Sequence, residues 1–401
     1  MSRTADYTIQ GFIYQFIVTL HKILLTTDDK TEITIEGPIE DIDIATPTGI
    51  IAMQCKYHEA KEKFTLSSIY KPVLQMMNHY KKNSSEKIKY RLYAHFPNET
   101  VGSKKVLSTI EVNQILSSKA KEYKDLIKEL DGFTDISGFL TMFELEFGAS
   151  LADLEKSVIV SLSKEGFSTE DSEELFYPNA IHRIAELSTK HLESERKIQK
   201  TEFISILKEK KKTAINRWTK ELKSFDKLLK KRREQMRDNL NKNSRERAII
   251  LDSQYIHDYE AKIVQLIEDF VNKYNSKIKL HHCPLFSLIA DNDSLNDIWR
   301  RLNTRKIIVE RGFIAGQIDV KYFLREPMKV FKENKSEFNV RLCSHDTEFS
   351  KILLEATFDD IIVISDKKFE FLNTIRDTNI EIIETKEINE IKYLLSLNNS
   401  L

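Results

Sequence analysis

The chain has 401 residues, with 62 Lys plus Arg balanced by 62 Asp plus Glu, so no overall positive charge points to nucleic acid. This length predicts two or three domains. Three widely separated cysteines without a CxxC pair, and no recognisable signal peptide, predict a cytoplasmic protein. No apolar run approaches the roughly 18 residues that span a bilayer, so no membrane association is expected.

An amphipathic helix is predicted over residues 7–25. Its apolar side chains recur at helical spacing and form a wide buried face: Phe12, Ile13, Phe16, Ile17, Leu20, Ile23 and Leu24. Gln15 lies in the middle of this helix, where its side chain could reach the waters of a metal site. The alternative is a half-exposed glutamine on a helix that packs against a sheet.

Short strands joined by tight turns are predicted between Ile33 and His58. Apolar residues alternate in two runs, and Pro38, Pro47 and Gly49 interrupt them. Four carboxylates lie on or beside the early strands: Glu36, Glu40, Asp41 and Asp43. Gln54 and Lys56 follow on a later strand. Residues two apart on a strand share a face, so Gln54 lies beside Lys56, and Asp41 beside Asp43.

Carboxylates near a Gln-x-Lys pair suit metal-assisted hydrolysis of a phosphodiester. Mg²⁺ (or Mn²⁺) takes oxygen ligands, here expected from Glu36, Asp41, Asp43 and Gln54. The metal lowers the pKa of a bound water and neutralises charge on the phosphate. The Lys56 ammonium can stabilise that charge or orient the water. The predicted catalytic residues are therefore Asp41, Asp43, Gln54 and Lys56, with a solvated hairpin face as the alternative.

The elements that follow complete a predicted α-β-β-β-α-β order. Residues 68–83 predict a second helix, and residues 87–96 alternate as a further core strand. Residues 100–200 are helical by periodicity, with Phe139–Phe147 and Leu154–Leu162 apolar enough to be buried. No chemical motif is present in residues 100–200.

A long basic helix is predicted from Lys208 to Arg237, where thirteen Lys or Arg accompany only four Asp or Glu. An apolar and aromatic stripe recurs within this charge: Trp218, Leu222, Phe225, Leu228 and Leu229. Clustered cations displace the counterions of DNA, so Lys230, Lys231, Arg232 and Arg233 are candidate contacts to its backbone. A solvated helix that packs its stripe on neighbouring elements is the alternative.

Residues 248–401 predict a separate α/β unit with a partly parallel sheet. Its short strands alternate with helical stretches, the first of them at His257–Asn275. The expected strands are Ala248–Leu251, Lys306–Glu310, Asn339–Leu342, Asp360–Ser365 and Glu381–Glu384.

The run His281-His282-Cys283 suggests metal binding by its residue types. No second cluster has zinc-like spacing, however, and Cys343 and His345 lie far along the chain. A structural zinc site is therefore not predicted. No phosphate-binding G-x-x-x-x-G-K-[ST] is present, so hydrolysis of a nucleoside triphosphate is not expected either.

Residues 9–58 resemble the nuclease domain of bacterial anti-phage effectors, a domain with the PD-(D/E)XK (restriction-endonuclease-like) fold. The matching features are GFIYQ at Gly11–Gln15, the acidic element from Glu36 to Asp43, and Gln54-Cys55-Lys56. The run LSSIYKPVLQMMNHY continues the likeness, which covers about the first hundred residues. The resemblance maps the family motif onto Glu36, Asp41 or Asp43, Gln54 and Lys56, and the choice of aspartate stays open.

Together with the patterns farther along the chain, the resemblance predicts an α/β protein in three parts: a nuclease domain at 1–120, a helical region with the basic helix at 121–245, and an α/β regulatory or partner-binding domain at 246–401. Members of this group cleave double-stranded DNA with a divalent metal, usually after forming homo-oligomers. Two subgroups are relevant. CBASS effector nucleases carry a C-terminal sensor of cyclic oligonucleotides, whereas the nuclease of Lamassu-type systems works with an SMC-like ATPase and an accessory subunit.

Because the C-terminal part shows no recognisable sensor pattern, we expect a Lamassu-like DNA endonuclease that a partner controls. One alternative is a CBASS-type nuclease activated by a cyclic oligonucleotide. The other is an inactive nuclease-fold scaffold that binds DNA or a partner.

Overall fold

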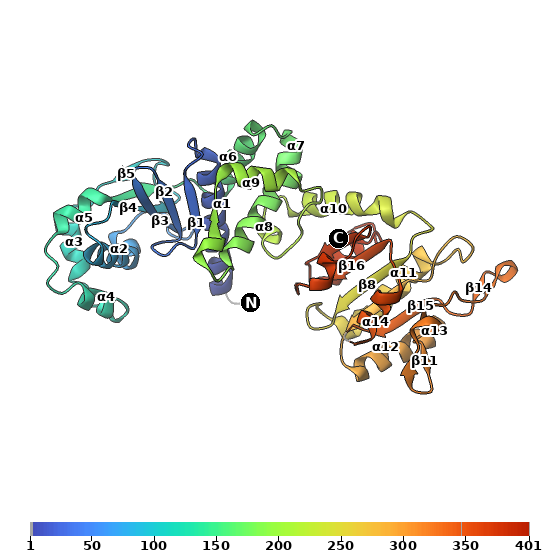
Figure 1. The fold of residues 1–401 in the computed structure, drawn as a ribbon. Helices are drawn as coiled ribbons and strands as arrows, with labels where there is room; N and C mark the ends of the chain where they lie inside the picture. Colours follow the sequence, from blue (N-terminus) through green and yellow to red (C-terminus); the bar gives the residue numbers. More distant parts are fainter. Residues whose placement is uncertain (1–2, 346, 401) are drawn as a thin grey trace. The chain divides into compact units, whose positions relative to one another are not determined.

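A computed structural model describes residues 3–345 and 347–400, which form two compact units. Unit 1 comprises the chain up to Ala214 together with Glu221–Ser224, and unit 2 comprises Ile215–Lys220 and Phe225–Leu401. Both units are layered helices and sheets (Figure 1), which confirms the predicted α/β class. The region 121–245 does not form a third body, because its residues are divided between the two units.

Unit 1 opens with the predicted helix and hairpin strands. In chain order its elements are α1 (Arg3–Leu25), β1 (Glu32–Ile35), β2 (Ile42–Thr46), β3 (Gly49–Tyr57), α2 (Tyr70–Lys82), β4 (Ile88–His95), β5 (Lys104–Lys105), α3 (Thr109–Leu116), α4 (Lys124–Glu129), α5 (Ile136–Met142), β6 (Phe143–Phe147), α6 (Leu151–Lys164), α7 (Thr169–Asp171), α8 (Tyr177–Ser188), β7 (Lys197–Ile198) and α9 (Lys200–Lys208).

The unit 1 strands form one mixed sheet in the order β5-β6-β4-β3-β2-β1-β7. β1, β2 and β3 pair antiparallel, whereas β3, β4 and β6 run parallel. In the β2–β3 register Asp43 lies opposite Ala52. Directly opposed residues point to the same side of a sheet, so Asp43 shares a face with Ala52 and, by alternation, with Gln54 and Lys56.

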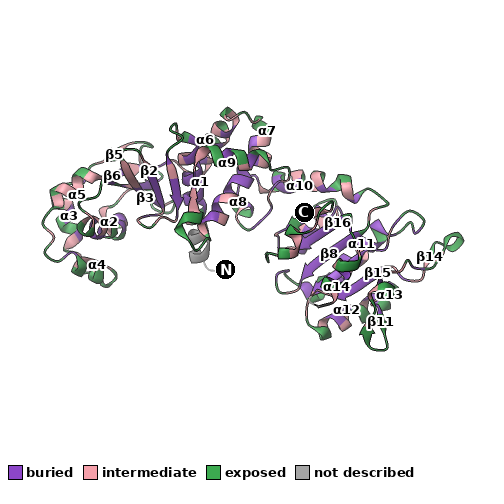
Figure 2. Cartoon of the chain, in the orientation of Figure 1, coloured by how far each residue is buried: buried purple, intermediate pink, exposed green. Residues whose placement is uncertain are grey.

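Helices cover both faces of this sheet, and its central strands are buried (Figure 2). On one face, side chains of α2, α3 and α5 pack with alternate residues of β3 and β4 in a single core: Ala52, Val73, Met76, Met77, Tyr90, Leu92, Val112 and Phe139. On the other face α1 contacts β3, α6 and α8. The core therefore positions β3, the strand that carries Gln54 and Lys56.

The prediction that residues 100–200 are wholly helical is wrong around Phe143. α5 ends at Met142, and Phe143–Phe147 continue as β6, parallel to β4. Phe143–Phe147 is Phe-Glu-Leu-Glu-Phe, and this alternation of apolar and acidic residues is typical of a strand rather than a helix. Pairing with β4 decides in favour of the strand.

Unit 2 contains α10 (Phe225–Leu240), β8 (Arg247–Asp252), α11 (Tyr259–Tyr274), β9 (Leu285–Ile289), α12 (Asn292–Thr304), β10 (Val309–Glu310), β11 (Phe313–Ile314), β12 (Gln317–Ile318), α13 (Val320–Leu324), β13 (Lys329–Val330), β14 (Lys335–Ser336), β15 (Val340–Ser344), α14 (Thr347–Glu355), β16 (Asp360–Ile364), β17 (Asn379–Ile383) and α15 (Ile388–Leu394). The predicted strands appear with shifted ends. β9 was not predicted.

Six of these strands form a sheet in the order β10-β15-β9-β8-β16-β17, and every pair in it is parallel. α13 and α14 pack on one face, in the core that contains Phe323 and Phe349. Phe270 of α11 meets Phe286 of β9 edge to face, with ring centroids 5.6 Å apart. Alternate residues of β8 and β9 face opposite sides, so α11 covers the second face.

The prediction of one helix from Lys208 to Arg237 is wrong. α9 ends at Lys208, and the next long helix, α10, begins only at Phe225. α10 packs against α15, so it belongs to the core of unit 2. In the described part of the chain, no helix has the length and apolar character needed to cross a membrane.

Candidate functional site

The turn between β1 and β2 carries three of the four carboxylates that lie on or beside the early strands. Glu36, Glu40 and Asp41 lie in this six-residue connection, and Glu36 N–H donates to the Asp41 carbonyl at 2.9 Å. Glu36 has a positive φ of 49°, which is uncommon for a residue other than glycine. The tight hairpin therefore brings acidic side chains from different sequence positions to one end of β2.

Asp43 holds this turn in shape. Its Oδ2 accepts a hydrogen bond from Ile39 N–H at 3.0 Å, and its Oδ1 accepts one from Glu40 N–H at 3.2 Å. Gly37 packs directly against the same carboxylate, because a Cβ at that position would lie 2.2 Å from Asp43 Oδ2. Both carboxylate oxygens are thus occupied by the backbone, which suits an anchor better than a metal ligand.

Asp41 lies against β3 beside the Gln-x-Lys pair. Its Oδ2 accepts a hydrogen bond from the backbone N–H of Cys55, the residue between Gln54 and Lys56, at 2.8 Å. Burial raises the pKa of Asp41, while the Cys55 bond and the charge of Lys56 act in the opposite direction. Of the two aspartates that the sequence leaves open, Asp41 is the one adjacent to Gln54 and Lys56.

Gln15 and Gln54 contribute amide groups from α1 and β3. Gln15 Nε2 donates to Glu36 Oε1 at 2.8 Å, so the helix residue orients an acidic side chain of the turn. Gln54 is 8% exposed, and its Oε1 is buried without a hydrogen-bond donor among the described residues. A buried amide oxygen without a partner is costly unless it has another ligand.

Glu40 was not assigned to the site from sequence, although the structure places it there. Burial raises its pKa to about 8; the charges of Asp41 and Asp43 add to this rise and that of Lys56 opposes it. Burial likewise raises the pKa of Glu36, against the Gln15 hydrogen bond and the charge of Arg196. The acidic run Glu40-Asp41-Ile42-Asp43 pointed to this part of the chain. Only the geometry of the turn shows which of its carboxylates lie at the site.

Two further residues near the site were missed. His58, two positions beyond Lys56, has a pKa lowered to about 4 by burial and by the charges of Lys61, Lys56 and His95, so it is neutral at pH 7. Arg196 precedes β7, and its charge acts on Glu36. Only the fold brings Arg196 to this site, because it is far from the motif in sequence.

The carboxylates and the Gln54 amide of this site are the kinds of oxygen ligand that a hard divalent cation binds. They offer carboxylates whose ionised forms are disfavoured by burial, together with the unpartnered Gln54 oxygen. They are not a compact cluster of three carboxylates: the described residues contain one set of three His, Cys, Asp or Glu ligands within 4.8 Å of one another, and it lies in unit 2. A cation here would therefore need the amide oxygen and waters as additional ligands.

The metal-free protein is expected to be less stable at pH 8 than near pH 5. The ordinary pKa of Glu40 is 4.5 and its folded value is about 8, so between these values the unfolded chain binds fewer protons and the free energy of unfolding falls as pH rises. Asp43, with a pKa of about 6, adds to this in the lower part of the range. A bound cation favours ionised carboxylates, so Mg²⁺ should raise Tm more at pH 8.

Differential scanning calorimetry with Mg²⁺ or a chelator at the two pH values measures this effect. Glu40→Gln keeps the shape and removes the titration, so it should lose much of the pH dependence. The same Mg²⁺ response at both pH values would contradict the assignment of these carboxyl groups to a cation site.

The predicted DNA contacts on α10 are partly unavailable. Arg232 is buried and pairs with Glu381 of β17 at 2.6 Å, and each side chain is 4% exposed. Arg233 donates to Ser396 Oγ and to the Asn398 carbonyl, and its guanidinium lies over the Tyr393 ring. Assigning Arg232 to DNA is therefore wrong, and Arg233 is already bound within unit 2. Lys230 is exposed and Lys231 half-buried, and both remain candidates.

Arg232→Gln is expected to lower the free energy of unfolding by about 3 kcal/mol, because it leaves the Glu381 carboxylate buried without its cation. The matched change Lys230→Gln on the exposed side of α10 should shift it by less than about 0.5 kcal/mol. Urea denaturation of both variants measures the difference. Equal midpoints would show that the pair contributes no stability.

Comparison with known proteins identifies no family. No protein-family model and no curated protein matches the chain. Among solved structures, a Cap4 SAVED/CARF-domain containing receptor from Moraxella osloensis is similar at 12% identity and a TM-score of 0.29, over 100% of this chain and 94% of the other. UDP-GlcNAc 2-epimerase from Neisseria meningitidis is similar at 13% identity and a TM-score of 0.17, over 79% and 77%. At these TM-scores neither similarity establishes the fold, the family or the function.

Proposed function

We propose that this chain is a metal-dependent endonuclease of double-stranded DNA, with its active site in unit 1 at Glu36, Glu40, Asp41, Gln54 and Lys56. The observation that supports this most directly is the buried, unpartnered Gln54 Oε1 on the face that also carries Lys56 and adjoins Asp41. The resemblance of residues 9–58 to the PD-(D/E)XK nucleases of anti-phage effectors agrees with this assignment.

Each side chain has a distinct task in this proposal. Asp41 and Gln54 are the residues that would hold Mg²⁺ or Mn²⁺, with Glu36 and Glu40 beside them. When bound, the metal supplies an activated water and neutralises charge on the scissile phosphate. The Lys56 ammonium stabilises the charge that develops on the phosphate. Gln15 orients Glu36, and Asp43 keeps the turn in the conformation that presents Asp41.

Incubation of the purified chain with supercoiled plasmid DNA tests this function. Nicked and linear products should appear with Mg²⁺ or Mn²⁺ and should be absent with chelator. A protein that binds the plasmid and leaves it intact with either metal, alone and with the activators named below, would instead be a nuclease-fold scaffold.

We further propose that the nuclease is a regulated effector of anti-phage or anti-plasmid defence, active as a homo-oligomer. In the Lamassu-like form of this proposal an SMC-like ATPase and an accessory subunit control it. The support is the resemblance of the N-terminal hundred residues. Co-expression with the products of neighbouring genes, followed by the plasmid assay, tests whether such a partner switches cleavage on.

One feature of unit 2 favours the second candidate, a nuclease activated by a cyclic oligonucleotide. Its sheet is parallel, and strand order reverses beside β8, because β9 follows on one side and β16 lies on the other. Open parallel sheets bind ligands at the carboxyl ends of the strands at such a point. There Asp252 accepts a hydrogen bond from Ser365 Oγ at 2.9 Å and pairs with Lys367 at 3.0 Å. Cleavage that requires an added cyclic oligonucleotide would favour this candidate over control by an ATPase.

A further inference from the structure

Unit 2 brings together three metal-ligating side chains that are far apart in sequence. Glu246 directly precedes β8, His282 lies in the loop before β9, and Glu326 follows α13. One carboxylate oxygen or imidazole nitrogen from each lies within 4.8 Å of the other two. The amino ends of β8 and β9 are neighbours in a parallel sheet, and this edge therefore collects the three segments.

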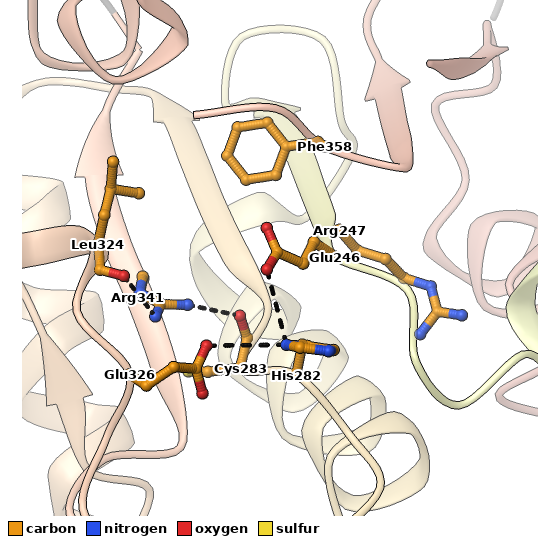
Figure 3. Close-up of a pocket in the computed structure, with 8 residues that line it drawn as sticks. All are labelled: Glu246, Arg247, His282, Cys283, Leu324, Glu326, Arg341 and Phe358. Atoms are coloured by element: carbon orange, nitrogen blue, oxygen red, sulfur yellow. Dashed lines mark hydrogen bonds and ion pairs between the residues drawn. The ribbon is translucent and has the colours of Figure 1, made fainter. Parts of the chain in front are cut away.

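The distances suit ligands of one ion better than a hydrogen-bonded network. His282 Nδ1 lies 3.7 Å from Glu246 Oε1 and 3.7 Å from Glu326 Oε1 (Figure 3), too far for hydrogen bonds. The same nitrogen is shielded from solvent and has no hydrogen-bond partner in the described part of the chain. Two ligands bound tetrahedrally to zinc at their usual bond lengths lie roughly 3.3 Å apart. The two His282 distances would need to shorten by about 0.4 Å each to reach this spacing, and the two carboxylate oxygens, which lie within 4.8 Å of each other, would need to approach as well.

A pocket surrounds these ligands. It encloses about 30 Å³, enough for a water molecule or for a metal ion that carries one. Leu324 and Phe358 contribute apolar side chains to its lining. Cys283 also lines the pocket, and its Sγ donates to the Pro284 carbonyl at 3.9 Å.

The cations around the pocket are engaged elsewhere. Arg341 donates to four backbone carbonyls, those of Cys283, Phe323, Leu324 and Arg325, which fixes the loops on either side. Arg247 pairs with Asp360 at 3.4 Å. Lys329 binds Glu326 through Oε2, which leaves Oε1 directed at His282.

We propose that Glu246, His282 and Glu326 form a second metal site, which binds a divalent transition-metal ion such as Zn²⁺ and fastens three segments at the amino edge of the unit 2 sheet. An imidazole with two carboxylates favours such ions, whereas Mg²⁺ prefers an all-oxygen shell. Small molecules that bind open parallel sheets do so at the carboxyl ends of the strands. A metal at the amino ends therefore has a structural role, which is to hold the three segments together. The site is independent of the nuclease assignment in unit 1.

Zinc titration of the chelator-treated full-length chain tests this proposal by isothermal titration calorimetry, with Tm measured in parallel. The titration uses the Asp41→Asn background, so that the unit 1 site contributes little. One equivalent of Zn²⁺ should bind and raise Tm. His282→Ala should weaken this binding by at least about tenfold, since even the loss of a group that only orients a ligand costs that much. His257→Ala is the matched control, because His257 is exposed and faces a single carboxylate, Glu387, at 2.9 Å.

Glu326→Gln provides a second variant that keeps the side-chain shape, and circular dichroism checks that each variant is folded. Weakened zinc binding in folded Glu326→Gln or His282→Ala, with unchanged binding in His257→Ala, supports the site. Equal zinc binding in all variants, or no stoichiometric binding by the parent, overturns it. Neither result depends on DNA cleavage, so failure of the nuclease proposal is recognised separately by the plasmid assay.

Discussion

Asp41→Asn is expected to reduce metal-dependent DNA cleavage by on the order of a thousandfold, because it removes a ligand charge from the ion that activates water and neutralises the phosphate. Folding should be nearly unchanged. The asparagine Oδ1 can still accept the Cys55 N–H hydrogen bond that Asp41 Oδ2 accepts. Single-turnover cleavage over a range of Mg²⁺ concentrations measures both the rate and the metal dependence, and both should be affected together.

Asp43→Asn is the matched control, since it makes the same chemical change two residues away. Asp43 receives N–H groups on both carboxylate oxygens, and an asparagine can accept only one of them. We therefore expect a loss of about 1–3 kcal/mol in the free energy of unfolding, with the Mg²⁺ dependence of the remaining folded protein retained. The reverse pattern, with Mg²⁺ response lost in Asp43→Asn and kept in Asp41→Asn, would show that Asp43 is the principal ligand.

Lys56→Ala should lower the rate of cleavage by about a hundredfold to a thousandfold, by comparison with the removal of single electrostatic donors in other enzymes. Lys56 is half-buried near the end of β3, so its loss should change stability little. Mg²⁺ binding should persist, because the oxygen ligands remain. Cleavage rates at saturating DNA, together with calorimetric Mg²⁺ binding, separate the loss of catalysis from the loss of metal.

Lys61→Ala provides the comparison for this lysine, because Lys61 is exposed in the loop after β3 and its ammonium donates to the hydroxyl of Ser68 at 3.4 Å. It should cleave DNA at close to the parental rate. A folded Lys56→Ala protein that cuts as fast as the parent would remove Lys56 from the proposed mechanism.

Local sequence signals were sufficient for much of unit 1. Helical spacing of apolar residues predicted α1, and alternation interrupted by Pro38, Pro47 and Gly49 predicted the hairpin strands. The period-two geometry of a strand is also sufficient to place Gln54 beside Lys56 on one face. These features depend on residues within a few positions of one another, which is why a single sequence determines them.

The sequence could not predict which acidic residue does what. Asp41 and Asp43 are equivalent by strand alternation, and only the turn, in which two N–H groups occupy the Asp43 carboxylate, distinguishes them. The same holds for Arg232, whose place in a basic run suggests a surface residue. Its burial against Glu381 depends on the docking of α10 with β17, which lies far along the chain.

By itself, then, the sequence determined the α/β class, the order of the hairpin strands and the Gln54–Lys56 pair, because local periodicity and turn residues encode them. Tertiary structure alone decided the two-unit division and the meeting of Glu246, His282 and Glu326. Each of these depends on contacts between distant segments. No ligand spacing in the sequence points to a metal site at His282, because its two carboxylate neighbours come from distant segments. The parallel pairing of β8 with β9 brings Glu246 to it, and the loop after α13 brings Glu326.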